Sequence, residues 1–173
     1  MSNILLHEKQ LTFFQYIDKY YHQVYEMFSL YNGKELVRYK ENFFHKLNFY
    51  SNFKENLTKR YYNFLLIYNI NKSEIIGFIY MYNYEPKNET VFLDIFMKND
   101  EYYGAISLGF LNSYLENVTS NKKIRTIYTH CFEYEKQKQS FFKRCNFKLI
   151  GRMCEYRYYN KNYVDVNILE LNL

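Results

Sequence analysis

The 173-residue chain contains one proline, five glycines and no tryptophan. Because proline and glycine mark most turns, their scarcity makes the predicted ends of helices and strands imprecise. The three cysteines, Cys131, Cys145 and Cys154, have neither paired spacing nor a zinc-ligand pattern with histidine, which argues against a disulfide scaffold or a zinc site. No apolar run reaches the roughly 18 residues of a membrane span, and the N-terminus lacks the apolar stretch of a signal peptide. We therefore expect a soluble, cytoplasmic protein without a membrane partner.

The chain is rich in aromatic and apolar residues. It has 22 tyrosines and 16 phenylalanines, and 48% of its residues are hydrophobic, enough for one sizeable core over residues 1–173. The formal charge is +5, but 17 lysines stand against 6 arginines. Specific recognition of phosphates and bases favours arginine, so a lysine-rich composition does not by itself indicate a nucleic-acid partner.

The hydrophobic periodicity changes along the chain. The first part has mainly helical spacing, and the middle has the pattern of a strand meander with short polar turns. From residue 103 onward, predicted helices and strands follow one another. Strands are predicted at 4–6, 62–68, 75–84, 90–97, 124–131, 147–158 and 163–171. Helices are predicted at 11–28, 40–48, 103–118 and 135–145. The order β-α-α-β-β-β-α-β-α-β-β predicts an α/β single domain with a mixed central sheet flanked by helices.

The closing third resembles a known family. The run from Phe141 to Arg152, FFKRCNFKLIGR, is similar to the last helix and following strand of the GCN5-related N-acetyltransferases, "x-Y-x-K-x-G-F-x-x-x-G". The run from Glu155 to Val166, with a turn at Asn160-Lys161-Asn162 and then Tyr-x-Asp, is similar to the tail of the subgroup that acetylates ribosomal proteins. The predicted element order agrees with that fold. The resemblance covers 62–173 well and the first 60 residues by element order alone.

The resemblance implies transfer of an acetyl group from acetyl-CoA to an amine. In the family, the third strand of the meander and the next strand part, and the thioester lies between them. The pyrophosphate rests on the loop that enters the following helix, where free N–H groups attract anions. The cofactor-binding residues implied here are Ile95, Phe96, Met97, Asn99, Tyr102, Gly104, Ala105, Lys138 and Phe142.

Two features depart from the family pattern. The phosphate loop Q/R-x-x-G-x-G/A falls on Asn99 to Gly104, and there Tyr102 stands in place of the first glycine. Glycine lets a backbone approach phosphate closely, which a tyrosine side chain hinders. Phe142 occupies the position of a tyrosine that can protonate the departing thiolate, and phenylalanine donates no proton.

Asp94 and His130 are the candidate catalytic residues. Asp94 interrupts an apolar strand, and a carboxylate there is costly unless it is paired or faces a cleft. It can serve as the base that deprotonates an incoming ammonium, or it can be paired with a lysine or arginine on a neighbouring strand. His130 ends the next strand and is either a base, a substrate ligand or an ordinary polar strand end. Cys131, its neighbour, should point to the opposite sheet face.

The acceptor side is predicted from the same resemblance. Arg38 and Tyr39 lie between the first two predicted helices, and Tyr156 lies on a closing strand, where these residues would border the acceptor. Two functions remain open at this point: an N-acetyltransferase acting on a primary amine, or a catalytically weakened binding module that keeps the fold. A homodimer through the closing strands is a further expectation.

Overall fold

The computed structural model describes residues 4–8, 11–15, 18–20, 22–24, 26–27, 62–104, 106, 108–119, 123–159 and 161–173. The architecture is that of these described residues. The strands are β1 (Ile4–Glu8), β2 (Leu11–Gln15), β3 (Tyr62–Asn69), β4 (Glu74–Glu85), β5 (Thr90–Met97), β6 (Thr126–Phe132), β7 (Lys148–Tyr159) and β8 (Asn162–Asn172). The helices are the 3-10 helices η1 (Asp18–Tyr20) and η3 (Asp100–Gly104) and the α-helices α4 (Leu108–Thr119) and α5 (Lys136–Arg144).

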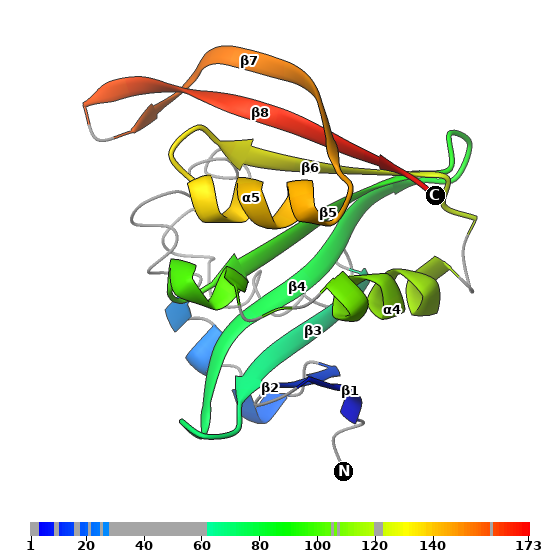
Figure 1. Ribbon diagram of the computed structural model, residues 1–173, viewed down its shortest axis with the longest axis vertical. Helices are drawn as coiled ribbons and strands as arrows, with labels where there is room; N and C mark the ends of the chain where they lie inside the picture. The colour runs from blue at the N-terminus through cyan, green and yellow to red at the C-terminus, as the bar shows by residue number, and fades with distance from the viewer. Residues whose placement is uncertain are drawn as a thin grey trace.

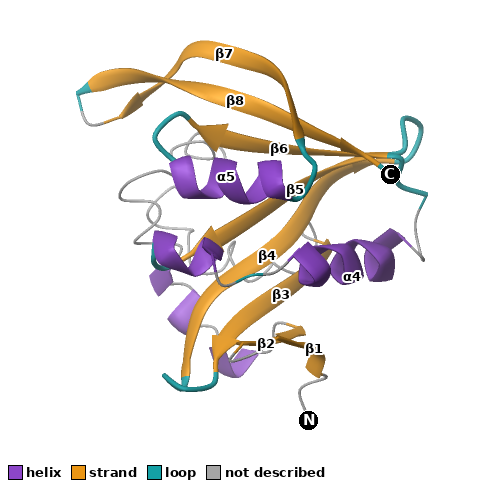
Figure 2. Cartoon of the chain, viewed as in Figure 1, coloured by secondary structure: helices purple, strands orange, loops and turns teal. Residues whose placement is uncertain are grey.

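The strands form one eight-stranded sheet in the order β1-β2-β3-β4-β5-β6-β8-β7. Every neighbouring pair is antiparallel except β5 and β6, which run parallel. The parallel pair needs a crossover connection, and η3 and α4 supply it. The two helices α4 and α5 lie on the same face of the sheet, and the β7–β8 hairpin arches at its far end (Figures 1 and 2). The predicted α/β fold with a mixed sheet is thus confirmed.

The face under α4 and α5, called the helix face, holds the main core. Helix α4 buries a stripe of apolar residues three and four apart, which is why this segment is helical. Odd-numbered strand residues such as Ile79, Leu93 and Ile95 pack in the same cluster as the buried side chains of α4 and α5. Side chains alternate along a strand, so the even-numbered residues from Phe78 to Tyr82 in β4, from Phe92 to Phe96 in β5, and Tyr128 and His130 in β6 belong to the opposite face.

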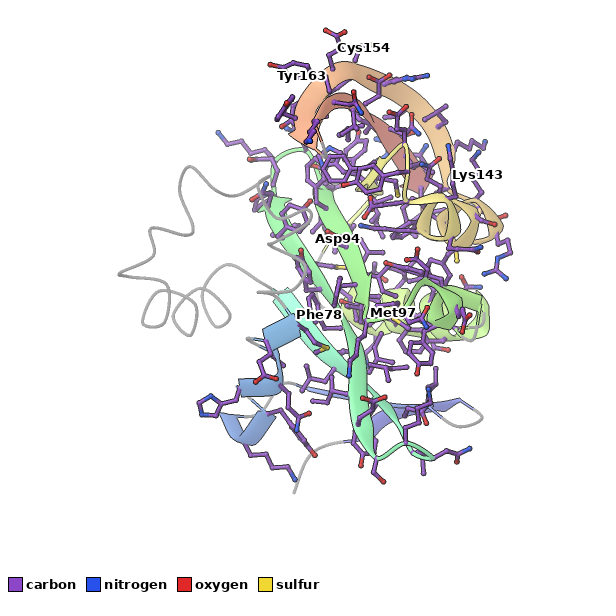
Figure 3. The ribbon with its side chains drawn as sticks, turned by 90° about the vertical axis from the view of Figure 1, so that its left-hand side faces the viewer. Phe78, Asp94, Met97, Lys143, Cys154 and Tyr163 are labelled. Atoms are coloured by element: carbon purple, nitrogen blue, oxygen red, sulfur yellow. The ribbon has the colours of Figure 1, made fainter. Side chains whose placement is uncertain are left out.

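That opposite face, called the aromatic face, is a row of contacting rings. Phe78 stacks on Phe96 at 5.0 Å between ring centroids, and Phe92 lies 4.9 Å from the His130 ring. The members of the row are Phe78, Tyr80, Tyr82, Phe92, Phe96, Tyr128 and His130. Seen edge-on, Met97 lies on the helix side of the sheet while Phe78 and Asp94 lie on the other side (Figure 3).

The close approach of β4 and β5 requires a glycine at one position. A Cβ atom added to Gly77 would lie 2.3 Å from the carbonyl oxygen of Phe96 and 2.7 Å from the sulfur of Met97. Lys98, just beyond β5, donates its N–H to the Ile76 carbonyl at 2.7 Å and holds the two chains at this distance. No larger residue therefore fits at Gly77 without a shift of the strand pair.

The predicted helix over 11–28 is wrong in its first part. Leu11–Gln15 is strand β2, paired with both β1 and β3, and among the described residues of this stretch the 3-10 helix η1 and the α-helical residues 22–24 and 26–27 follow it. A strand flanked on both sides gains a full set of ladder hydrogen bonds, and this tertiary pairing outweighs the local apolar spacing. Val24, which belongs to the predicted apolar stripe, is buried, and so is Met27. The predicted helix 40–48 lies outside the described residues.

The helix predicted at 103–118 begins later than expected. Asp100–Gly104 forms η3, and α4 starts only at Leu108. Tyr103 is 4% exposed and belongs to the core from its place in η3. The other expected elements are present with ends shifted by a few residues.

A salt bridge shapes the β7–β8 hairpin at the sheet edge. The register of the two strands shifts between Met153 and Arg157, and Glu155 has a positive φ of 49°. Asp165 of β8 accepts the Glu155 N–H at 2.7 Å and pairs with the Arg152 guanidinium. This bulge bends β7, whose outer edge is unpaired in the sheet order and carries exposed Tyr156 and Tyr158. The predicted homodimer would use this edge and stays a prediction.

Candidate active site

The strands β5 and β6 pair over only three positions. Thr90 pairs with Thr126, Val91 with Ile127 and Phe92 with Tyr128, and beyond Phe92 and Tyr128 no further pair forms. The remaining residues of β5 and β6 therefore part from one another (Figure 1). We call the space between these parted segments of β5 and β6 the gap. Side chains from β5, η3 and α5 meet around the part of β5 that has left β6.

Asp94 lies two residues beyond the last pair with β6. The residue is 4% exposed, and its carboxylate has three partners. Its Oδ1 accepts the N–H of Ile95 at 2.9 Å, and its Oδ2 accepts the Tyr80 hydroxyl at 3.3 Å. The ammonium of Lys138 lies 2.7 Å from Oδ1. A buried carboxylate is expensive without such partners, so these contacts explain how the apolar strand tolerates it.

Lys138 is the buried cation that pairs with Asp94. Its side chain is 1% exposed, and its Nζ also lies 3.3 Å from Oε1 of Glu135, three residues earlier in the chain. The other carboxylate oxygen of Glu135 accepts the N–H of Phe132 at 2.6 Å. The Phe132 carbonyl accepts a bond of 2.6 Å from the Gln139 amide. Side chains at the start of α5 thus bind the main chain where β6 ends.

Tyr103 closes the gap from the η3 side. Its hydroxyl donates to the Ile95 carbonyl at 3.1 Å, and its own carbonyl accepts a bond from Arg144 at 3.2 Å. Burial raises the pKa of Tyr103 well above its ordinary value, so the hydroxyl stays a hydrogen-bond donor. With the Ile95 N–H bound to Asp94, both main-chain groups of Ile95 are bonded within the chain.

The loop predicted to hold a pyrophosphate also bonds to itself. The Asn99 side chain accepts the N–H of Glu101 at 3.0 Å, and the Asn99 carbonyl accepts the N–H of Tyr102 at 3.0 Å. The Tyr102 hydroxyl accepts a bond of 2.6 Å from Lys72, which draws this ring toward the β3–β4 turn. Gly104 is exposed, and an added Cβ would meet nothing within 4 Å. Asp100 and Glu101 in the first turn disfavour an anion there.

The structure separates several of the predicted site residues. His130 lies on the aromatic face against Phe92, the face onto which Asp94 also alternates, whereas Cys131 is buried in the core under the helices, as strand alternation predicted. Phe142 is fully buried and packs on Phe141 and Phe147 with ring centroids 5.3 and 4.9 Å away. Phe96 faces the aromatic side and Met97 the core.

Other predicted positions lie away from the gap or outside the described residues. Tyr156 is 54% exposed on β7. Arg38, Tyr39 and Ala105 lie outside the described residues. Lys138, one of the implied cofactor-binding residues, is buried, while Lys136, Lys143 and Arg144 form the exposed basic part of α5.

The sequence did contain a signal for the buried position of Lys138. Residues 138, 141, 142 and 145 have the i, i+3, i+4, i+7 spacing of one helix face, and Phe141, Phe142 and Cys145 are all buried. A lysine on the apolar face of a helix needs a carboxylate partner. Glu135 and Asp94 were the nearby candidates, and only the crossing of α5 over β5 shows that both take part.

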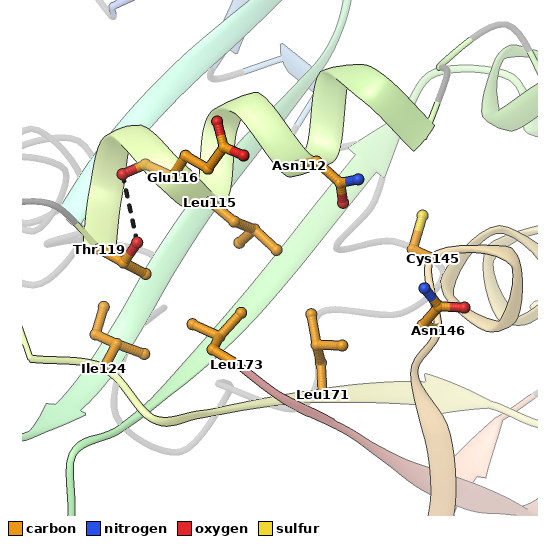
Figure 4. Close-up of a pocket in the computed structure, with 9 residues that line it drawn as sticks. All are labelled: Asn112, Leu115, Glu116, Thr119, Ile124, Cys145, Asn146, Leu171 and Leu173. Atoms are coloured by element: carbon orange, nitrogen blue, oxygen red, sulfur yellow. Dashed lines mark hydrogen bonds between the residues drawn. The ribbon is translucent and has the colours of Figure 1, made fainter.

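A separate hollow lies at the other end of the sheet. It measures about 290 Å³ and lies between α4, the end of β8 and the α5–β7 connection (Figure 4). Its lining residues include Leu115, Ile124, Asn146 and Leu171. Because it borders the start of β6 whereas the gap opens near the end of β6, the hollow is not part of the candidate site.

Among the described residues, no group of histidine, cysteine, aspartate or glutamate is arranged to hold a metal ion. The helices of the described part of the chain are too short or too polar to cross a membrane.

No protein-family model matches the sequence, and no curated protein sequence matches it. Solved structures do match the fold. A spermidine N-acetyltransferase from Vibrio cholerae superposes with a TM-score of 0.73 at 13% identity, covering 94% of both chains. The ribosomal-protein α-N-acetyltransferase RimL superposes with a TM-score of 0.72 at 16% identity, covering 100% of this chain and 96% of that one.

A third match is the microcin self-immunity acetyltransferase MccE, in complex with acetyl-CoA and AMP. It has a TM-score of 0.68 at 16% identity and covers 96% of this chain and 94% of that one. At these identities the likeness establishes the fold. The chain therefore has the N-acetyltransferase fold that its closing third predicted, and the predicted likeness to the ribosomal-protein-acetylating subgroup is confirmed at the level of the fold.

Proposed function

We propose that this protein is an N-acyltransferase that transfers an acetyl group from acetyl-CoA to a primary amine. The observation that carries the proposal is the parting of β5 and β6 after three residue pairs, with the carboxylate of Asp94 just beyond. The proteins of similar fold include a spermidine N-acetyltransferase and an α-N-protein acetyltransferase, and the acceptors that these names give are both amines. An amine acceptor is therefore the shared chemistry that the proposal adopts.

Asp94 is the proposed base. A primary amine is an ammonium at neutral pH and cannot attack a carbonyl carbon until it loses a proton. The Asp94 carboxylate already binds one ammonium, that of Lys138, at 2.7 Å, so its position suits a positively charged nitrogen. The Tyr80 hydroxyl holds the second oxygen and orients the carboxylate. Bound acetyl-CoA would supply the activated acyl group.

The leaving thiolate has no proton donor at Phe142, because that residue has no hydroxyl and is packed between Phe141 and Phe147. A thiol has a pKa near ~8.5, so the thiolate can leave without a dedicated acid. The proposal accordingly assigns proton transfer to Asp94 alone.

The test is acetyl transfer to a panel of amines, comprising a polyamine, an amino sugar and a peptide with a free N-terminus. Product masses and release of free thiol are measured together. We expect the wild type to acetylate at least one amine, and Asp94→Asn to lose at least about 100-fold in rate, the range of a general base. Lys161→Ala, in the exposed turn between β7 and β8, is the comparison variant and should keep the wild-type rate. Absence of any acetylated product with folded protein would contradict the proposal.

A second candidate function is a binding module without catalysis. It is favoured by the two main-chain bonds of Ile95 and by the acidic first turn of η3, both of which disfavour a CoA ligand. The same assay separates the two, because a module of this kind forms no acetylated amine even when every variant is folded.

A further inference from the structure

Lys138 reaches from one face of the sheet to the other. It belongs to α5, on the helix face, and it lies on the same side of that helix as the core residues Phe141 and Phe142. Asp94 alternates onto the aromatic face, where the hydroxyl of Tyr80 meets its carboxylate. An ammonium 2.7 Å from Asp94 therefore extends into the gap between β5 and β6.

The ion pair is built into the fold. The side chains of Lys138 and Asp94 are 1% and 5% exposed, and Glu135 adds a second carboxylate 3.3 Å from the ammonium. Glu135 is in turn held by the N–H of Phe132 at 2.6 Å. Both edges of the gap are thus tied to the same three charged side chains, through Ile95 on β5 and Phe132 on β6.

We infer that Lys138 is an intramolecular occupant of the gap, and that a CoA thioester binds there only after this side chain withdraws. The inference rests on the proposed function, since it concerns the loading of that same site. A thioester and the Lys138 side chain require the same space between the parted strands. The structure is accordingly the closed form, in which the Lys138 ammonium blocks the binding of the acyl donor.

The geometry also provides for withdrawal. Glu135 precedes Lys138 by three residues, so the lysine keeps this partner when its ammonium leaves Asp94. Asp94 would then be free to bind the ammonium of an acceptor, which compensates the buried carboxylate as Lys138 does in the closed form. The Lys138 ammonium thus marks the position of the acceptor nitrogen.

The first experiment measures the affinity of coenzyme A by calorimetry for the wild type, Lys138→Ala and Lys138→Met. If the closed form accounts for about 90% of the molecules, removing the occupant raises the apparent affinity about tenfold. Lys138→Met keeps most of the side-chain volume, so its affinity for coenzyme A should rise less than that of Lys138→Ala. Lys161→Ala removes one positive charge from the exposed β7–β8 turn and should leave the affinity unchanged. Circular dichroism confirms that each variant is folded.

The second experiment measures how accessible the Lys138 amine is to a modifying reagent in the wild-type protein. Reductive methylation, followed by mass spectrometry of the peptides, should modify the exposed Lys136 and Lys143 but leave Lys138 unmodified. Saturating coenzyme A should make Lys138 reactive, because its ammonium has left the gap. A Lys138 that stays protected while coenzyme A is bound would overturn the inference.

The outcomes separate the two proposals. If the wild type binds coenzyme A as tightly as Lys138→Ala and acetylates amines, Lys138 does not block the gap, and the proposed function stands. If Lys138→Ala binds coenzyme A about tenfold more tightly than the wild type but no variant acetylates an amine, the inference that Lys138 blocks the gap is supported. The proposed function then fails. If no variant binds coenzyme A, both are overturned.

Discussion

The hydroxyl of Tyr103 donates a 3.1 Å hydrogen bond to the carbonyl of Ile95, the residue whose N–H is bound by the Asp94 carboxylate. Tyr103 comes from η3 and Ile95 from β5, so this bond joins the loop to the parted strand. A strand that loses its neighbour leaves main-chain groups without partners, and buried groups of this kind require new ones. Asp94 and Tyr103 supply them.

Tyr103→Phe should destabilise the protein by about 1–3 kcal/mol, because the buried Ile95 carbonyl loses its donor while the ring still fills its place. Urea unfolding measures the change. Tyr102→Phe is the matched control, since the Tyr102 hydroxyl bonds only to an exposed lysine, and it should cost less than about 0.5 kcal/mol. Equal effects of the two substitutions would contradict the assigned role of the Tyr103 hydroxyl.

Asp94→Asn should destabilise the protein strongly, by about 3–5 kcal/mol, because it breaks a buried ion pair and leaves Lys138 with less compensation. Lys98→Ala removes an ion pair with Glu74 whose side chains are 48% and 36% exposed, and it should cost less than about 1 kcal/mol. The double variant Asp94→Asn, Lys138→Met removes both charges and should be more stable than Asp94→Asn alone. A double variant less stable than either single variant would contradict the pairing.

The Asp165 carboxylate should make the stability of the protein depend on pH in the acid range. The N–H of Glu155 and then the guanidinium of Arg152 lower the pKa of Asp165 below its ordinary value of 3.8. A pKa that is lower in the folded state means that the stabilisation is present above pH ~4 and is lost as pH falls through the folded pKa. The stability difference between the wild type and Asp165→Asn should therefore be constant from pH ~7 to ~5 and shrink below pH ~4. A difference that does not change in acid would refute this assignment.

Two glycines should respond in opposite ways to the same substitution. Gly77→Ala places a Cβ 2.3 Å from the main-chain oxygen of Phe96, which forces β4 and β5 apart and should cost about 1–3 kcal/mol or more. Gly104→Ala meets no atom within 4 Å, and none of the described glycines has a positive φ. It should be neutral or stabilise by up to about 1 kcal/mol through the unfolded state. Thermal and urea unfolding of both variants check the contrast.

The three cysteines should differ in reactivity. Cys154 is exposed, while Cys131 and Cys145 are buried, and burial raises the pKa of Cys145 to about 11. At pH ~8 a thiol-specific disulfide reagent should label one cysteine rapidly in the folded protein and all three in denaturant, because the thiolate is the reactive form. Replacing Cys154 by serine should abolish the rapid phase. Two rapid equivalents in the wild type would show that one of the buried thiols is accessible.

The sequence by itself determined the class of fold and the order of most of its elements. Apolar runs between short polar turns identified β4 and β5, helical spacing identified α4, and the run FFKRCNFKLIGR placed the closing third in a known fold. These signals are local, since each element carries its own periodicity whatever it packs against. Asp94 was recognisable for the same reason, as a single charge in an apolar strand.

Only the tertiary structure decided what Asp94 and Leu11–Gln15 do. Leu11–Gln15 is a strand because β1 and β3 flank it, which no spacing within the segment predicts. Lys138 meets Asp94 because α5 crosses the parted strands, although the two residues are 44 positions apart in the chain. Buried charges need partners wherever the fold brings them together, and that meeting depends on the packing of whole elements. Whether the gap is open to a ligand or filled by Lys138 is likewise a property of that packing.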